Sequence, residues 1–232
     1  MLNLSLYGLQ NDSIVTMNIK HLFAGIFVLV PFAFAAWVYP SLPPTIPIHF
    51  NMEGKADGWG SRDSVFVGPL ILGFVSIFVY LLMANIRKID PKRYEGADDK
   101  VYGQFGLFLV AFLAVLSLVI ILSSVNQNIP VEQLVFGIMG FAFAIMGIFM
   151  PRLKQNYMAG FRLPWTLEDE ENWKSTHILA GKYWLYGGLL QGIIAILLHG
   201  VWLFVTFMTL MAVMVVGPLI HSFKFFKKQQ KS

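Results

Sequence analysis

Six apolar stretches, each about twenty residues long, constrain this chain more than any other feature of its sequence. Roughly 20 apolar residues is the length that an α-helix needs to cross the hydrocarbon core of a bilayer. Only His199 and Gly200 separate the last two stretches, which predicts a tight helical hairpin there. The pattern predicts an all-α polytopic membrane protein with six transmembrane helices. The six stretches cover residues 21–39, 67–86, 106–124, 132–150, 181–198 and 201–220.

The composition agrees with a membrane protein and excludes several chemistries. Hydrophobic residues make up 56% of the 232 residues and charged residues only 13%, and the mean hydropathy is +0.64. A soluble domain of this size normally carries more charge. Cysteine is absent, so the chain has no disulfide, no thiolate nucleophile and no cysteine-based metal site.

Positive charge is divided unevenly between the segments that connect the apolar stretches. With six spans, 15 of the 17 Lys and Arg residues fall on the side that holds both termini, and only Lys55 and Arg62 fall on the other. Basic residues concentrate on the cytoplasmic side of membrane proteins. The distribution therefore predicts a multi-pass membrane protein with both termini in the cytoplasm and residues 40–66 outside. Residues 1–19 are interpreted as an extension, and Met17 is an alternative start.

The loop at residues 40–66 is expected to form a small structured cap outside the cell. Four prolines between residues 40 and 47 disfavour a helix and favour an extended exit from the first span. Residues 48–51 alternate apolar and polar side chains, as a short strand does, and residues 53–55 indicate a turn. His49, Glu53 and Asp57 are metal-ligating residue types, but their spacing suits a helix, so a hairpin without a metal is favoured.

Four consecutive acids at residues 168–171 stand out in the segment on the cytoplasmic side. Pro164 ends whatever precedes it, and Thr166 is a natural helix N-cap, with Asp169 three residues later. Acidic side chains are favoured in the first turn of a helix because the backbone N–H groups there lack partners. The acids are therefore explained by a helix start and require no ligand.

The residues that follow indicate a short helix at the membrane surface. Trp173, Thr176, His177 and Gly181 fall on one stripe of a helix. Trp165 and Trp173 suit the headgroup level, and Arg162 and Lys174 are expected to reach lipid phosphates or the nearby acids. We expect an interfacial helix leading into the fifth span, in which His177 packs and finds one partner or, alternatively, titrates.

No Asp, Glu, Lys or Arg lies deep within a predicted span. Glu132 lies at the start of the fourth span. Ion-coupled transporters usually keep such groups at mid-depth, so a proton-coupled transporter is disfavoured. Gly188 and Gly192 form a GxxxG spacing that favours helix packing over a ligand site. No enzyme motif is present, and neither an enzyme nor a cofactor is predicted. The milder polar residues in the spans are Ser76, Tyr80, Ser117, Gln191, Thr206 and Thr209.

Two motifs resemble a known family. The stretch FRLPWTLEDEENWKSTHILAGK, at residues 161–182, is similar to the signature of the SdpI family, integral membrane proteins of bacteria that give immunity against a secreted killing peptide. The loop LPPTIPIHFNMEGKADGWGS resembles the companion domain of unknown function, DUF1648, that usually precedes it. The signature matches are Arg162, Pro164, Trp165, Thr166, Leu167, Glu171, Trp173, Thr176, His177 and Gly181. The loop matches are Pro47, His49, Phe50, Asn51, Gly54, Asp57, Trp59 and Gly60.

The resemblance implies a DUF1648-like region at residues 20–100 and an SdpI-like region with the last four spans at residues 101–232. It further implies an immunity protein that meets a membrane-active peptide toxin, with membrane lipid as its surroundings and no nucleic-acid partner. The candidate exterior contacts are His49, Phe50, Asn51, Asp57 and Trp59. The cytoplasmic signature is a candidate relay to a soluble regulator. A small-molecule transporter or membrane enzyme using His49 or His177 is the alternative.

Overall fold

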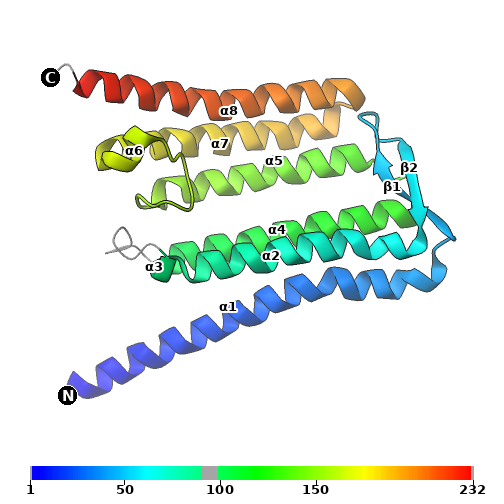
Figure 1. Ribbon diagram of the computed structural model, residues 1–232, viewed down its shortest axis with the longest axis horizontal. Helices are drawn as coiled ribbons and strands as arrows, with labels where there is room; N and C mark the ends of the chain where they lie inside the picture. The colour runs from blue at the N-terminus through cyan, green and yellow to red at the C-terminus, as the bar shows by residue number, and fades with distance from the viewer. Residues whose placement is uncertain (1, 90–98, 231–232) are drawn as a thin grey trace.

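Long helices whose axes run side by side make up most of the chain in the computed structural model (Figure 1). The structure describes residues 2–89 and 99–230, and the side chains of residues 19–89 and 100–230. The long helices are α1 (Leu2–Val38), α2 (Val67–Ala84), α4 (Asp99–Val125), α5 (Val131–Phe149), α7 (Glu170–Leu197) and α8 (Gly200–Gln229). The shorter helical turns are η1 (Tyr39–Ser41), η2 (Arg62–Phe66), α3 (Ile86–Ile89), η3 (Met150–Arg152) and α6 (Pro164–Glu168). Two strands, β1 (Thr45–Phe50) and β2 (Ala56–Ser61), form an antiparallel hairpin.

Within the described residues, five helices are long and apolar enough to cross a membrane, one fewer than the sequence predicts. They lie within Ile19–Ser41, Arg62–Ala84, Lys100–Val125, Val131–Arg152 and Gly200–Gln229. Helix α7 has the length but not the hydropathy, because Lys182, Gln191 and several glycines interrupt its apolar run. It nevertheless runs beside α5 and α8 in the bundle (Figure 1).

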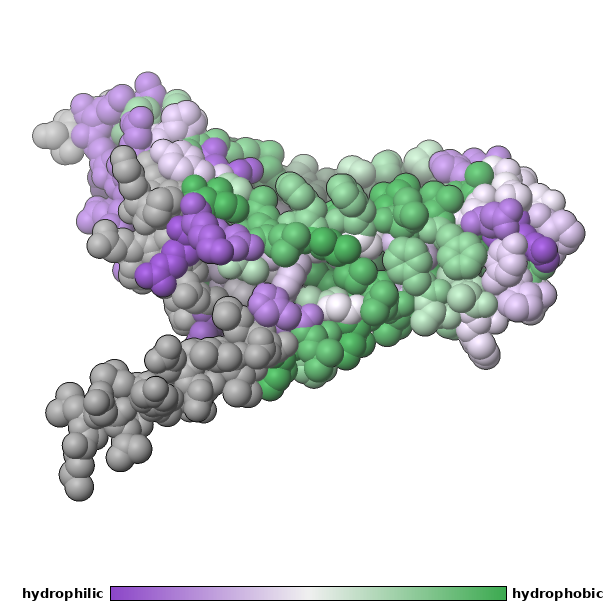
Figure 2. Space-filling view, turned by 60° about the horizontal axis from the view of Figure 1, so that its bottom comes forward, coloured by the Kyte–Doolittle hydropathy of each residue, from purple (hydrophilic) through white to green (hydrophobic). Residues whose placement is uncertain are grey.

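An apolar surface surrounds the middle of the bundle. Figure 2 shows a broad hydrophobic band between two hydrophilic ends. Large side chains such as Trp37, Phe74, Ile196 and Trp202 lie more than two-thirds exposed on it. A soluble monomer rarely exposes so extensive an apolar surface, so this band is the part of the molecule that faces lipid.

The two ends of the bundle differ in structure. We call the end with β1 and β2 the hairpin end; it also holds residues 126–130 and 198–199. The opposite end, with residues 150–177, α3 and the start of α4, is called the signature end. Both chain termini lie toward the signature end (Figure 1). Three helices pack together in each half of the chain, α1 with α2 and α4, and α5 with α7 and α8, and α4 contacts α5 between the halves.

Helices α5 and α7 approach each other backbone to backbone. A Cβ added at Gly147 would lie 2.5 Å from the amide nitrogen of Leu185, and one at Gly188 would lie 2.4 Å from that of Ala144. Small residues at such positions let two helices pack closely in a membrane. The GxxxG spacing at Gly188 and Gly192 therefore serves packing within one chain, as the sequence predicts. It also fixes the position of the signature that α7 carries.

Some helices extend beyond the stretches that the sequence predicts. Helix α1 runs without a break from Leu2 to Val38, so residues interpreted as an extension continue into the helix of the first span. The proline-rich exit from α1 is only partly extended, since Pro40 lies inside η1. The helix that holds the third span, α4, begins at Asp99, earlier than the predicted stretch. The predicted turn at His199 and Gly200 is confirmed, and Gly200 adopts a positive φ of 58° there.

Candidate functional sites at the two ends of the bundle

The hairpin is held in shape by its turn. The side-chain oxygen of Asn51 accepts hydrogen bonds from the backbone N–H groups of Glu53 and Lys55, both at 3.0 Å. Gly54 adopts a positive φ of 72°, which favours glycine. Asn51, predicted as a toxin contact, is thus committed to the turn. The strand predicted at residues 48–51 is confirmed in kind, although β1 begins three residues earlier, at Thr45.

The exposed side of the hairpin carries three of the five predicted exterior candidates. The Nδ1 atom of His49 lies 2.5 Å from the Oδ1 atom of Asp57, and both side chains are exposed. Trp59 pairs with Pro47 in the strand register and is 51% exposed. Phe50 is only half-buried and lies opposite Ala56. This surface combines an imidazole–carboxylate pair with a large aromatic ring, a mixture that suits recognition of a peptide.

The hairpin is anchored to both halves of the bundle. Ile46 is buried in a cluster with Ala35 and Val38 of α1 and Ile121 of α4. The turn reaches the other half, because a Cβ added at Gly54 would overlap the carboxylate of Glu132 in the first turn of α5. The side chain of Glu132 is only 12% exposed, and its Oε1 atom lies 4.0 Å from the Nδ1 atom of His199. The hairpin therefore links α1 and α4 to α5 at the hairpin end of the bundle.

The hairpin does not assemble a metal site. His49 and Asp57 pair with each other, whereas Glu53 pairs with Lys55 at 2.9 Å, and this hydrogen bond raises the pKa of Lys55. Across residues 19–89 and 100–230, no three His, Asp or Glu side chains lie close enough to hold a metal ion.

At the signature end, the loop that follows η3 folds back over α7. The side chain of Asn156 organises this loop, since its oxygen accepts from the N–H groups of Met158 and Ala159. Its amide nitrogen donates to the carbonyl of Lys154 at 2.7 Å and to the hydroxyl of Tyr102 at 3.3 Å. Tyr102 belongs to α4, so the loop contacts both halves of the bundle. Neither Asn156 nor Tyr102 was predicted, because a single Asn or Tyr carries no distinctive spacing.

His177 is buried beneath this loop with both ring nitrogens occupied. Its Nε2 atom accepts a hydrogen bond from the N–H of Phe161 at 3.0 Å, so its Nδ1–H donates to the carbonyl of Trp173 at 2.8 Å. The ring is 1% exposed and stacks on Trp173 with centroids 4.0 Å apart. Burial lowers the pKa of His177 to about 4, although its hydrogen bond to Trp173 opposes that shift. The ring is therefore neutral at pH 7 and serves as a structural acceptor, in agreement with the simpler of the two sequence interpretations.

The position of Gly160 depends on the same histidine. Gly160 adopts a positive φ of 111°, and a Cβ added there would lie 2.2 Å from the Nε2 atom of His177. Both the conformation and the space therefore require glycine. Arg162, two residues later, is exposed and donates to the carbonyl of Tyr157 at 2.6 Å.

The helix starts in the signature differ from those predicted. Thr166 is not an N-cap but lies within α6, where its hydroxyl accepts from the N–H of Leu163 at 2.9 Å. Asp169 is the N-cap of α7, and its side chain accepts from the N–H of Glu171 at 2.9 Å. The acids still lie at a helix start as predicted, but an intervening break after Glu168 moves that start by three residues.

The predicted interfacial helix is part of a longer one. The stripe of Trp173, Thr176, His177 and Gly181 lies on α7, which continues without a break to Leu197. All four residues are buried, and Trp173 donates to the carbonyl of Leu153 at 2.8 Å. Trp173 is therefore inside the protein and does not face the lipid headgroups. The loop covers this face of α7, and Gly181 lies against Gly147 and Pro151. The sequence alone assigns the same face to the membrane surface.

Trp165 joins the signature to the last helix. Its indole N–H donates to the hydroxyl of Ser222 on α8 at 2.5 Å, and its ring stacks on Phe226. The Ser222 carbonyl also accepts from the side chain of Asn172, which in turn accepts from Thr176. Of the signature residues, Arg162, Pro164 and Glu171 are exposed, and Trp165 is half-buried. The signature residues thus mainly join α6, α7 and α8 to one another.

These observations define a multi-pass helical membrane protein with an ordered hairpin at one end and a folded polar loop at the other. Residues 152–222 match the model of the SdpI/YfhL protein family, and residues 26–73 match a domain of unknown function, DUF1648. The chain is also similar to immunity protein SdpI of Bacillus subtilis (strain 168), at 22% identity over 209 residues. That alignment covers 90% of this chain and 97% of the relative. These matches confirm the recognition of the SdpI family from the two sequence motifs, whereas no solved structure matches.

Proposed function

We propose that this protein gives its cell immunity against a secreted, membrane-active peptide. The similarity to an immunity protein over nine-tenths of the chain carries this proposal. The matched segments include both the hairpin and the signature, so the resemblance extends over the two candidate sites.

The proposed orientation places the hairpin end outside the cell and both termini in the cytoplasm. The distribution of Lys and Arg supports it, because 15 of 17 belong to the segments that the sequence assigns to the side of both termini. Helix α7 is proposed to cross the membrane as the fifth of six spans. Lys182 is exposed, but Gly181, Gly188 and Gly192 lie against α5 and Gly187 lies against α8, so part of its low hydropathy reflects helix packing.

The proposed contact surface for the peptide is the exposed side of the hairpin, with His49, Asp57 and Trp59. An exposed aromatic ring beside charged side chains is a common composition for a site that binds a peptide. The anchoring of Gly54 against Glu132 keeps this surface in a fixed position above the bundle. The peptide would meet it before reaching the lipid.

A survival assay tests this proposal. Cells that produce the protein are expected to survive at peptide concentrations that kill cells without it, in a panel of secreted membrane-active peptides. Trp59→Ala is expected to raise sensitivity at least about tenfold, because truncating a central aromatic contact typically costs 1–2 kcal/mol or more. Lys55→Ala, another exposed change on the hairpin, is the matched control and should leave survival unchanged, with membrane protein levels measured for both. Equal survival with and without the wild-type protein across the panel would contradict immunity.

A relay to a soluble cytoplasmic regulator is a second proposal. The exposed Arg162, Pro164 and Glu171 favour it, because they stand at the surface while the rest of the signature is mostly buried. Arg162→Ala is expected to abolish affinity capture of the regulator by the intact protein, whereas Lys224→Ala on α8 is not. Capture of no soluble partner by the wild-type protein, with or without peptide, would end this proposal.

The remaining alternative, a transporter or membrane enzyme, receives little support from the histidines. His177 has both nitrogens engaged within the protein, so it has no free atom to offer a substrate. His49 is exposed to solvent and pairs only with Asp57 in the contacts described, without the enclosed surroundings that catalysis needs.

A further inference from the structure

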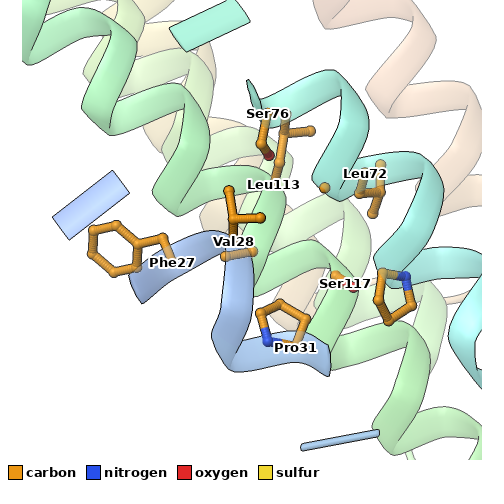
Figure 3. Close-up of a pocket in the computed structure, with 10 residues that line it drawn as sticks. Phe27, Val28, Pro31, Leu72, Ser76, Leu113 and Ser117 are labelled. Atoms are coloured by element: carbon orange, nitrogen blue, oxygen red, sulfur yellow. The ribbon is translucent and has the colours of Figure 1, made fainter. Parts of the chain in front are cut away.

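A small pocket inside the apolar band lies between α1, α2 and α4 (Figure 3). Phe27, Val28 and Pro31 line it from α1, Leu72 and Ser76 from α2, and Leu113 and Ser117 from α4. The pocket has room for about one water molecule. Apart from two serines, the labelled side chains around it are apolar.

The Ser117 hydroxyl lacks a hydrogen-bond partner within the described part of the chain, although Ser117 is only 1% exposed. Other hydroxyls in the spanning helices behave differently, since those of Ser123, Thr206 and Thr209 donate to carbonyls of their own helices. An unpaired hydroxyl inside an apolar region typically costs about 1–3 kcal/mol. In this conformation the Ser117 hydroxyl is open to a partner from outside the protein.

Two further polar groups border the same pocket. Ser76 is buried on α2, with 3% of its surface exposed. On α1, Pro31 lies inside the helix and has no N–H, so the carbonyl of Phe27 lacks its usual intrahelical donor. The residues that line the pocket thus include two serines, on α2 and α4, and Phe27 of α1, whose carbonyl lacks the donor that Pro31 would otherwise supply.

We propose that this pocket is a binding site for a single water molecule that joins α1, α2 and α4. A buried water needs about two to four polar partners and a space of its own size. Water donates to the Phe27 carbonyl and exchanges hydrogen bonds with both serine hydroxyls, which satisfies all three groups together. Lipid tails offer no donor or acceptor, so the surrounding membrane cannot replace it.

The water has a structural consequence for the proline in α1. Proline inside a helix weakens it by removing one hydrogen bond and by crowding the preceding turn. A water that ties the Phe27 carbonyl to α2 and α4 holds the weakened turn in place. Helix α1 leads directly into the hairpin, so this site also fixes the height of β1 and β2 above the bundle.

A double-mutant cycle tests the shared water. The unfolding equilibrium of the full chain is measured in mixed detergent micelles for Ser76→Ala, Ser117→Ala and the double variant. The first substitution releases the water. The second substitution therefore removes fewer hydrogen bonds than it would alone. Each single substitution raises the unfolding constant by a certain factor. The factor for the double variant is expected to be at least about threefold smaller than the product of the two single factors.

Ser76→Ala combined with Ser123→Ala is the matched control, because Ser123 donates to its own helix at Ile120. The two effects should multiply in that pair. If the effects of Ser76→Ala and Ser117→Ala on the unfolding constant also multiply, the two hydroxyls have separate partners and the proposal of a shared water is wrong. If Ser117→Ala does not fold, the cycle between Ser76→Ala and Pro31→Ala tests the same water through the Phe27 carbonyl, and multiplying effects there would overturn it equally.

Discussion

Gly147→Ala is expected to destabilise the folded protein by about 3 kcal/mol, since overpacking a tight contact typically costs this much. The added methyl group would lie 2.5 Å from the amide nitrogen of Leu185 and 2.7 Å from the carbonyl oxygen of Gly181. Both atoms belong to the backbone of α7, so no side chain can rotate away. The two helices must separate, which weakens every contact along their crossing and displaces the signature that α7 carries.

The unfolding free energy in mixed detergent micelles measures this effect, and Gly137→Ala is the matched control. Gly137 lies on the same helix, but a Cβ there would meet its nearest neighbour, the Cβ of Ala195, at an ordinary 3.5 Å. Alanine is the better helix former, so the control should be neutral or slightly stabilised, by up to about 1 kcal/mol. Equal stabilities for the two variants would show that α5 and α7 do not depend on backbone contact.

The protein is expected to lose about 3 kcal/mol of stability through His177 as the pH falls from 6.5 to 4. The folded state holds the pKa of this ring at about 4, below its ordinary value of 6.5. Between these two pH values His177 binds a proton in the unfolded chain but not in the folded protein. Stability is therefore complete above pH 6.5 and declines as the pH falls through about 4, by about 1.4 kcal/mol for each unit of pKa shift.

Protonation would also break a contact, because a charged ring donates from both nitrogens and can no longer accept from the N–H of Phe161. Unfolding free energies measured at pH 7, 5.5 and 4.5 test this, with His177→Gln as the comparison. Glutamine does not titrate, so the variant should start less stable but vary less with pH. Parallel pH profiles for the two proteins would place the acid sensitivity elsewhere, on the carboxylates or the exposed histidines.

The local features of the hairpin were predictable from neighbouring residues. Asn51, Gly54 and the alternation of residues 48–51 specify a turn between two short strands through chemistry that acts over a few positions. The contact between Gly54 and Glu132 was not predictable. The two residues lie 78 positions apart, and nothing in either segment indicates that the turn rests on the start of α5.

The signature also combines features that were predictable from the sequence with features that were not. Its acids predict a helix start, and one exists there, but whether Thr166 or Asp169 forms the N-cap depends on the loop that accompanies it. The stripe of Trp173 and His177 follows from helical spacing, yet spacing cannot distinguish a face that meets lipid from one that meets protein. The loop organised by Asn156 covers that face and makes the tryptophan an interior residue.

The sequence by itself determined the helical membrane class, five of the spans and the two recognisable motifs. Those properties depend on hydrophobic length and short-range pattern, which the chain carries without reference to its fold. Only the tertiary structure decided that the glycines of α7 pack against α5, that His177 is a neutral acceptor, and that Ser117 borders a pocket. Each of these depends on which distant groups approach within hydrogen-bonding or van der Waals distance, and that is set by the packing of all the helices together.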